Sequence, residues 1–159
     1  MLRGFERFSG VEVSTLAFGP SGHHTKPAGL VIESYLQRRA YASPEEDLDQ
    51  VKSIVDPARV ERNHNAHGFH YSEGHAVYED GSRAPGDPPG SMAFPRTSLL
   101  RINHYITKSI DEYATKRAQW VAAGLNRRPA RPAWVDELSA ERDDSITMYV
   151  PALREALRR

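Results

Sequence analysis

The sequence predicts an α/β protein in which helices flank a mixed sheet. Alternating apolar and polar side chains predict short strands at residues 11–18, 51–55, 75–78 and 98–102. Ser109 and Glu112, three positions apart, form a capping box, which predicts a helix that ends near Gly124. With 159 residues, the chain is long enough for one domain with a modest core.

The charges are balanced, with 21 Lys and Arg against 21 Asp and Glu, and the isoelectric point is about 7.1. This balance gives no electrostatic argument for a nucleic acid or an anionic membrane as a partner. The chain has no cysteine, which excludes disulfides and thiolate metal sites and fits a reducing compartment. It has neither an apolar run near the roughly 18 residues of a membrane helix nor a signal-peptide pattern at its start. We therefore expect a soluble, cytoplasmic protein.

The first strand leads into a loop rich in residues that break helices. Glycine, proline and serine are so frequent in residues 19–29 that we expect a shaped loop there. Residues 30–39 are then predicted to form a helix with Glu33 near its first turn. A strand, a glycine-rich loop and a helix in this order are a common setting for binding sites in α/β proteins.

Three histidines, His64, His67 and His70, lie close together in residues 63–71. Neutral imidazole binds divalent metals, but the spacing differs from the HExxH pattern of zinc proteases, and the segment is too rich in Gly and Asn for a helix. Two interpretations stay open: a metal site that combines His67 with a partner on another strand, or a surface loop with incidental histidines.

A polar run, residues 103–108, occupies the expected turn between the strand at 98–102 and the helix that starts at Ser109. A helix N-terminus exposes unpaired N–H groups and a partial positive charge, so Lys108 and Ser109 are candidates for binding a phosphate or another anion. His104 beside them is a candidate ligand for a divalent metal. Alternatively, the acidic residues of the first helical turn already complement the dipole, and His104 makes a hydrogen bond in the core.

The end of the chain is expected to form two helices, at residues 134–138 and 144–157, and Pro151 predicts a kink or an early break in the second. We expect these helices to pack on the preceding domain. The predicted organisation is therefore a domain of residues 1–126 and a helical extension of residues 127–159.

The polar run has a counterpart in known enzymes. Asn103-His104-Tyr105, followed by Thr107-Lys108-Ser109 and a helix that contains Glu112 and Lys116, resembles the closing motif of the family 92 glycosyltransferases and their bacterial relatives, often described as family 2 type glycosyltransferases. Residues 18–33, 51–57 and 65–69 are similar to other segments of the family, in the same order. The resemblance covers nearly the whole chain from Phe5, but only the C-terminal part of the family's domain.

The resemblance implies the C-terminal, acceptor-side half of the type A glycosyltransferase fold. The implied reaction transfers a sugar from a nucleotide-sugar donor to a hydroxyl acceptor with inversion, and uses Mn or Mg. The donor-binding half, with its acidic metal motif, would lie upstream or on a separate chain. Asp47-Leu48-Asp49 is not assigned to that motif, because we expect residues 42–50 to form a solvated helix capped by Ser43.

The resemblance also implies roles for individual residues. Glu33 is the candidate catalytic base, and the candidate acceptor-binding residues are Ser21, Gly22 and His23. The donor diphosphate would be held by Asn103, Lys108 and Ser109, and the metal by His104 and, second, His67. Two alternatives remain: a non-catalytic fragment or binding module, and a His-based metalloenzyme unrelated to sugar transfer.

Overall fold

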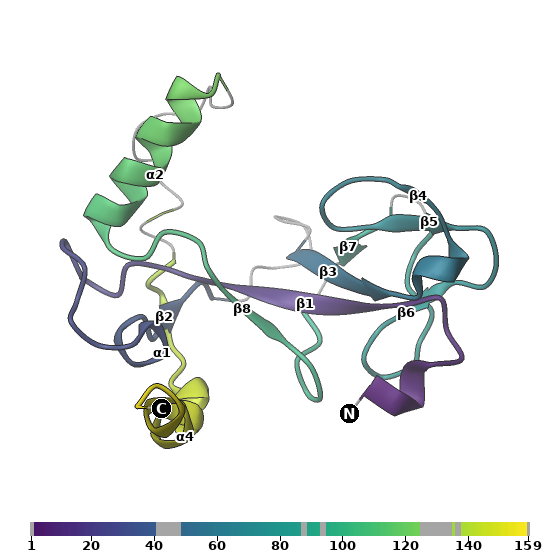
Figure 1. Ribbon diagram of the computed structural model, residues 1–159, viewed down its shortest axis with the longest axis horizontal. Coiled ribbons are helices and arrows are strands. Elements are labelled where there is room, and N and C mark those ends of the chain that lie inside the picture. Colours follow the sequence, from purple (N-terminus) through teal and green to yellow (C-terminus); the bar gives the residue numbers. More distant parts are fainter. Residues whose placement is uncertain are drawn as a thin grey trace. The chain divides into compact units, whose positions relative to one another are not determined.

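The computed structural model describes residues 2–40, 49–86, 89–92, 95–124, 135 and 138–158, which form a mixed α/β structure with a mostly antiparallel sheet (Figure 1). The chain divides into two compact units. Unit 1 contains residues 1–16 and 41–103, and unit 2 contains residues 17–40 and 104–159.

Unit 1 is built around the first part of β1 (Gly10–Phe18). β3 (Asp49–Val55) pairs with β1 antiparallel, from Gly10 opposite Val55 to Ser14 opposite Val51, and β6 (Ala76–Val77) pairs with it in parallel. β7 (Ser91–Met92) pairs antiparallel with β3. β4 (Val60–Asn63) and β5 (Phe69–Tyr71) form a separate antiparallel pair. Unit 1 also contains the 3-10 helices η1 (Leu2–Phe5) and η2 (Pro57–Arg59).

Both faces of β1 are buried. Side chains alternate between the faces of a strand, so Val11 and Val13 lie on one face, where they form a cluster with Val77. The opposite face carries the cluster of Val51, Ala76, Tyr78 and Ala84. Glu12 lies on that second face, because it is two positions from Ser14, which pairs opposite Val51 of this cluster.

Unit 2 contains the end of β1, where Phe18 pairs with Arg38 of β2 (Gln37–Arg38). The next strand of this ladder is β9 (Glu141–Arg142), which pairs antiparallel with β2. Arg38 is buried and bonds to Glu141 at 2.7 Å and to Asp143 at 3.2 Å, so an ion-pair network reinforces this short ladder. The other elements are α1 (Val31–Ser34), α2 (Ile110–Ala122), η3 (Ser145–Tyr149) and α4 (Val150–Ala156). β8 (Ile102–Tyr105), which pairs with β1, precedes α2.

Within unit 2, Tyr35 and Gly19 contact other elements of the unit and fix the course of residues 19–35. Tyr35 is almost fully buried, and its hydroxyl donates to Glu112 Oε2 at 2.7 Å, which ties the end of α1 to the first turn of α2. A Cβ at Gly19 would lie 2.5 Å from Leu138 Cβ and 2.7 Å from its carbonyl oxygen, so only glycine lets the chain pass there.

Several predicted elements are confirmed. β1 covers residues 11–18, β3 covers 51–55 and β6 lies within 75–78. The capping box is present, because Ser109 accepts from the Glu112 N–H and Glu112 accepts from the Ser109 N–H, and the helix ends before Gly124, whose φ is 69°. Pro151 lies in the first turn of α4, where a 3-10 helix gives way to an α-helix and the missing N–H of proline costs no hydrogen bond.

Two predicted elements are wrong. The helix at 30–39 is only α1, because Tyr35 leaves the helical region (φ −105°, ψ 82°) and the next residues form β2. The strand at 98–102 begins only at Ile102, and β8 continues through Asn103 and His104, which were expected in a turn.

Glu79 explains why the strand begins late. The buried Glu79 carboxylate accepts three consecutive N–H groups, from Ser98 at 2.6 Å, Leu99 at 2.9 Å and Leu100 at 2.5 Å. These N–H groups are therefore not available to a neighbouring strand.

The predictions for residues 42–48 and Trp134, and the predicted domain boundary at 126/127, lie outside the described residues. The helix predicted at 42–50 is wrong at its last two positions, because Asp49 begins β3. Within the described part of the chain, the helices are too short or too polar for any of them to cross a membrane.

We predict that Glu79→Ala lowers the free energy of unfolding by about 1–3 kcal/mol, because three N–H groups lose their charged acceptor. Urea denaturation measures the change. Glu73→Ala is the matched control, since the Glu73 side chain is 72% exposed and pairs only at the surface with Arg59. Equal stability of the two variants would show that Glu79 does not organise residues 98–100.

Candidate functional site

A hollow of about 430 Å³ in unit 2, called here the loop hollow, is lined by Ser21, His23, Glu33, Ser34, Leu36, Gln37 and Arg142. It brings together three of the residues singled out in the sequence: Ser21, His23 and Glu33. Ser21 (φ 50°) and Gly22 (φ 80°) both adopt left-handed conformations, so the loop turns sharply at this point.

The side chains of the loop hollow are held in place by the segment that follows the loop. Ser21 Oγ accepts from the Gln37 N–H at 2.9 Å, and His23 Nε2 donates to the Ser34 carbonyl at 3.0 Å. The His23 ring also packs edge-on against Tyr35, with centroids 5.5 Å apart. The Ser21 hydroxyl proton and the second ring nitrogen of His23 can therefore bond to a ligand.

Glu33 has one structural and one exchangeable partner. Its Oε2 accepts from the Leu30 N–H at 3.1 Å, which caps α1, and its Oε1 lies 2.7 Å from Arg154 Nη2. The Glu33 side chain is 23% exposed and that of Arg154 is 57% exposed. An ion pair with such an exposed partner contributes little, so a ligand can displace Arg154 from Oε1.

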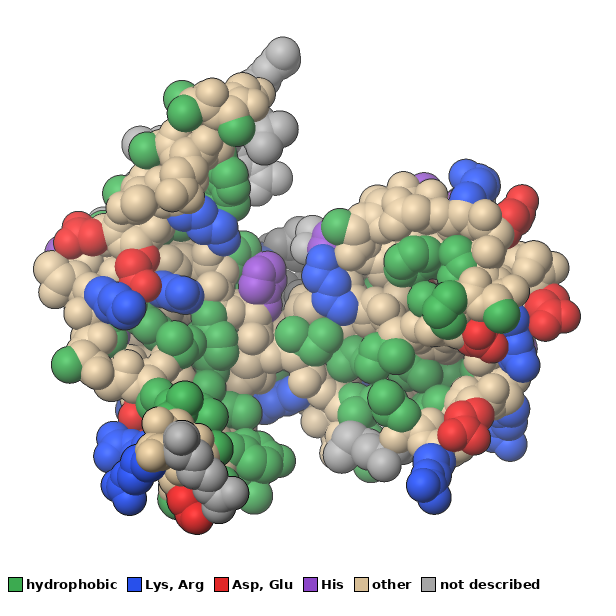
Figure 2. All heavy atoms as spheres, in the orientation of Figure 1, with side chains coloured by type: hydrophobic (Ala, Val, Ile, Leu, Met, Phe, Trp, Pro, Cys, Tyr) green, Lys and Arg blue, Asp and Glu red, His purple; other side chains and the backbone are tan. Residues whose placement is uncertain are grey.

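A second hollow, of about 630 Å³, lies at the start of α2 and is called here the lysine hollow. Its lining includes Lys26, Lys108 and Lys116 as well as Asp111 and Glu112. Figure 2 shows basic and acidic side chains close together over the start of this helix. The three lysines exceed the two carboxylates by one positive charge.

The lysines of this hollow are only partly neutralised. Lys116 Nζ donates to the Ile106 carbonyl at 3.2 Å, and burial, with a smaller contribution from the charge of Lys108, lowers the pKa of Lys116. Lys108 Nζ is 3.9 Å from Glu112 Oε1. An anion placed between Lys108 and Lys116 would relieve their repulsion.

The backbone N–H groups of the predicted anion site already have acceptors within the protein. The N–H groups of Ile110 and Asp111 donate to the carbonyls of His23 and His24 at 3.1 and 3.0 Å, and the Glu112 N–H donates to Ser109 Oγ. These bonds anchor the glycine-rich loop to α2, and they occupy the donors that a phosphate would need. Ser109 is fully buried, and its hydroxyl donates to Glu112 Oε2 at 2.9 Å. Lys108 is therefore the residue of this pair that lines the hollow.

Asn103 and His104 are adjacent in β8, so their side chains point to opposite faces of the strand. Asn103 belongs to unit 1, and no described residue bonds to its buried side-chain amide. His104 belongs to unit 2 and is half-buried.

The histidine segment separates into a pair and a single residue. His64 Nδ1 and His70 Nε2 are 3.2 Å apart, with their rings edge-on. His67 turns toward β3, where its Nδ1 donates to the Val51 carbonyl at 2.9 Å and its own carbonyl accepts from Ser53 Oγ at 2.7 Å. Among the described residues, no three His, Asp or Glu side chains cluster as a metal would require.

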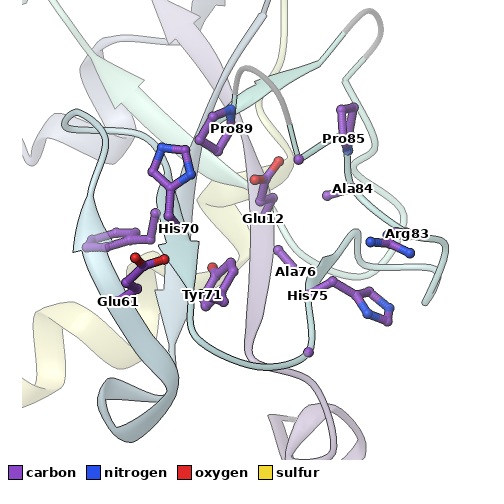
Figure 3. A pocket seen from close by; sticks show the side chains of 13 residues that line it. Glu12, Glu61, His70, Tyr71, His75, Ala76, Arg83, Ala84, Pro85 and Pro89 are labelled. Carbon is purple, nitrogen blue, oxygen red and sulfur yellow. The ribbon is translucent and has the colours of Figure 1, made fainter.

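Unit 1 has a hollow of about 220 Å³, the Glu12 pocket, which sequence analysis did not predict. Figure 3 shows Glu12 in its middle, with His70 and Tyr71 on one side and Ala84 and Pro85 on the other. Glu12 is 2% exposed, and burial raises its pKa to about 7 against the lowering effect of a bond from the Gly90 N–H. A polar residue between two valines normally faces water in such a strand. The sequence pattern does not reveal that Glu12 is buried, because the face of β1 that carries Glu12 is covered only when other strands pair with β1.

Comparisons with known proteins gave no match to a family model, a curated protein or a solved structure. The resemblance to the family 92 glycosyltransferases stays a prediction.

Proposed function

We propose that this chain is the C-terminal, acceptor-side part of an inverting glycosyltransferase, which transfers a sugar from a nucleotide-sugar donor to a hydroxyl group. The supporting observation is that unit 2 gathers Ser21, His23 and Glu33 around one hollow and three lysines around another. The glycine-rich loop contributes to both hollows, through Ser21 and His23 in the first and Lys26 in the second.

In this proposal Glu33 is the general base. Inversion by direct displacement requires a general base, here a carboxylate, that takes the proton of the acceptor hydroxyl as the new bond forms. The incoming hydroxyl displaces Arg154 from Glu33 Oε1, while Oε2 stays bonded to the Leu30 N–H and fixes the carboxylate. Ser21 and His23 bind further hydroxyls of the acceptor, and Gly22, whose φ is 80°, makes the turn between them.

The lysine hollow is assigned to the departing diphosphate. Negative charge accumulates on that group as the bond to the sugar breaks, and fixed cations stabilise such charge most when they are partly buried. Lys116 is held by the Ile106 carbonyl, and Lys108 lies at the entrance to α2. Lys108 therefore keeps its predicted role, with Lys116 and Lys26 as further contacts.

His67 fits a metal ligand better than its spacing suggested. Its Nδ1 proton is bound by the Val51 carbonyl, which leaves the Nε2 lone pair available. Metal-binding histidines commonly have this outer contact to a carbonyl. A bound Mn or Mg would supply positive charge at His67.

The two alternatives differ in what they require. A His-based metalloenzyme needs at least three protein ligands for zinc, whereas the histidine segment brings only His64 and His70 together, so we do not propose it. A non-catalytic binding module would keep both hollows but would show no sugar transfer, even in a chain that also contains the donor-binding half.

We expect Lys108→Ala and Lys116→Ala each to weaken binding of a nucleoside diphosphate by about tenfold to a hundredfold, because a hydrogen bond to a charged group contributes about 1.5–3 kcal/mol. Isothermal calorimetry with uridine and guanosine diphosphate measures this loss. Lys52→Ala is the control, since Lys52 is in unit 1 and bonds to the Ala66 carbonyl. Unchanged affinity in both lysine variants would show that the diphosphate does not bind in this hollow.

His104→Ala is expected to weaken nucleoside diphosphate binding only when manganese is present, because a histidine that coordinates the metal affects the diphosphate only through that metal. Titrations with and without manganese make the comparison, and His24→Ala, a change of an exposed loop histidine, is the control. A lower melting temperature with unchanged affinity would instead assign His104 a structural role.

A further inference from the structure

The Glu12 pocket contains a buried carboxylate with an unused oxygen. Glu12 Oε1 accepts from the Gly90 N–H at 3.2 Å, but no described residue bonds to Oε2. An ionised carboxylate buried with a single hydrogen bond is unstable unless an opposite charge or further donors reach it. A ligand that brings both a positive charge and a donor would satisfy Oε2.

The Tyr71 hydroxyl provides a second polar group in the same pocket. It is buried, and no described residue bonds to it. A Cβ at Gly10 would lie 2.2 Å from this hydroxyl oxygen. The hydroxyl therefore fits here only because Gly10 has no side chain. Gly10 and Glu12 are two positions apart on one face of β1. Burial and, to a smaller extent, the charge of Glu12 raise the pKa of Tyr71. The two groups therefore face the same space.

The other lining residues define the charge and size of a suitable ligand. The described lining has two carboxylates, Glu12 and Glu61, and one cation, Arg83. Its net charge is therefore −1 when His70 and His75 are neutral, and one monocation neutralises this charge. Phe69 and the Tyr71 ring supply aromatic surface, which attracts cations. A cavity of about 150 Å³ is known to hold benzene, so 220 Å³ holds a six-membered ring with one substituent.

We propose that the Glu12 pocket is a binding site for a small organic monocation, a primary ammonium or guanidinium group on an apolar body about the size of one ring. The cationic group bonds to Glu12 Oε2 and the Tyr71 hydroxyl, and the apolar body lies against Phe69, Ala84 and Pro85. This site lies wholly in unit 1 and does not depend on the proposed sugar transfer.

Calorimetric titration of the 159-residue chain with cyclohexylammonium tests the proposal, and cyclohexanol is the neutral ligand of matched shape. At pH 8 we expect the cation to bind at least about tenfold more tightly than the alcohol, as for a hydrogen bond to a charged group. Glu12→Gln should lose this preference, whereas Glu61→Gln at the exposed rim should keep most of it. Tyr71→Phe should weaken cation binding and gives a second test if Glu12→Gln does not fold.

A change of pH provides an independent measurement. The groups that surround Glu12 are Tyr71 and His70 of β5, Glu61 of β4, and His75, Tyr78 and Arg83. Because the pKa of Glu12 is about 7, lowering the pH from 8 to 6 leaves about a tenth of the protein with an ionised carboxylate, so affinity should fall about tenfold. The fall should persist when both histidines are changed to asparagine. Equal binding of cyclohexanol, full cation binding by Glu12→Gln, or no binding of the cation to the folded wild type would overturn the proposal.

Discussion

Replacing Glu33 with glutamine is expected to slow sugar transfer by about two to four orders of magnitude while donor affinity stays nearly unchanged. Glutamine keeps the shape of the side chain and can still accept from the Leu30 N–H through its amide oxygen, but it cannot take the proton of an acceptor hydroxyl. The rate is measured with a chain that also contains the donor-binding half which the resemblance implies.

Arg154→Ala is the matched control for this change. It breaks the same ion pair, between Glu33 Oε1 and Arg154 Nη2, but leaves the carboxylate in place. We expect this variant to retain most of the rate, because the exposed pair contributes at most about 1 kcal/mol. Full activity of Glu33→Gln would eliminate Glu33 as the base, and an equal loss in both variants would show that the ion pair, not the base, matters.

The stability of the protein is expected to fall by about 2–3 kcal/mol between pH 5 and pH 8 on account of Glu12 alone. Burial raises the pKa of this carboxyl from 4.5 to about 7 in the folded protein, so the folded state binds the proton more tightly than the unfolded state. The protonated carboxyl therefore contributes its full stability below pH 4.5, and this contribution is lost as the pH rises through 7.

Urea denaturation of the wild type and Glu12→Gln at both pH values isolates this contribution, because other titrating groups affect the two proteins equally. The variant should gain stability relative to the wild type as the pH rises. Glu61→Gln is the matched control, since it changes an exposed carboxylate at the rim of the same pocket. A constant difference between Glu12→Gln and wild type would mean that Glu12 is not desolvated in the folded state.

Elements that depend on local interactions were predictable from the sequence. The helix α2 begins at Ser109 because two side chains three positions apart bond to each other's N–H groups, and it ends before a glycine that adopts a left-handed conformation. The course of β1 and the turn of the chain at Ser21 and Gly22 likewise follow from neighbouring residues. The nearness of Ser21, His23 and Glu33 was also foreseeable, since all three lie in or beside one loop.

Interactions between distant parts of the chain decided the rest. Glu79 binds the N–H groups of residues 98–100 and delays β8, and the pairing of β2 with β1 and β9 shortens the predicted helix to α1. The carbonyls of His23 and His24 occupy the N–H groups that α2 would otherwise offer to an anion. Glu12 is buried because β3 and β6 pair on either side of β1 and bring apolar residues to both faces. A sequence pattern specifies which face of a strand a side chain occupies, but only the packing of other segments determines whether that face meets water.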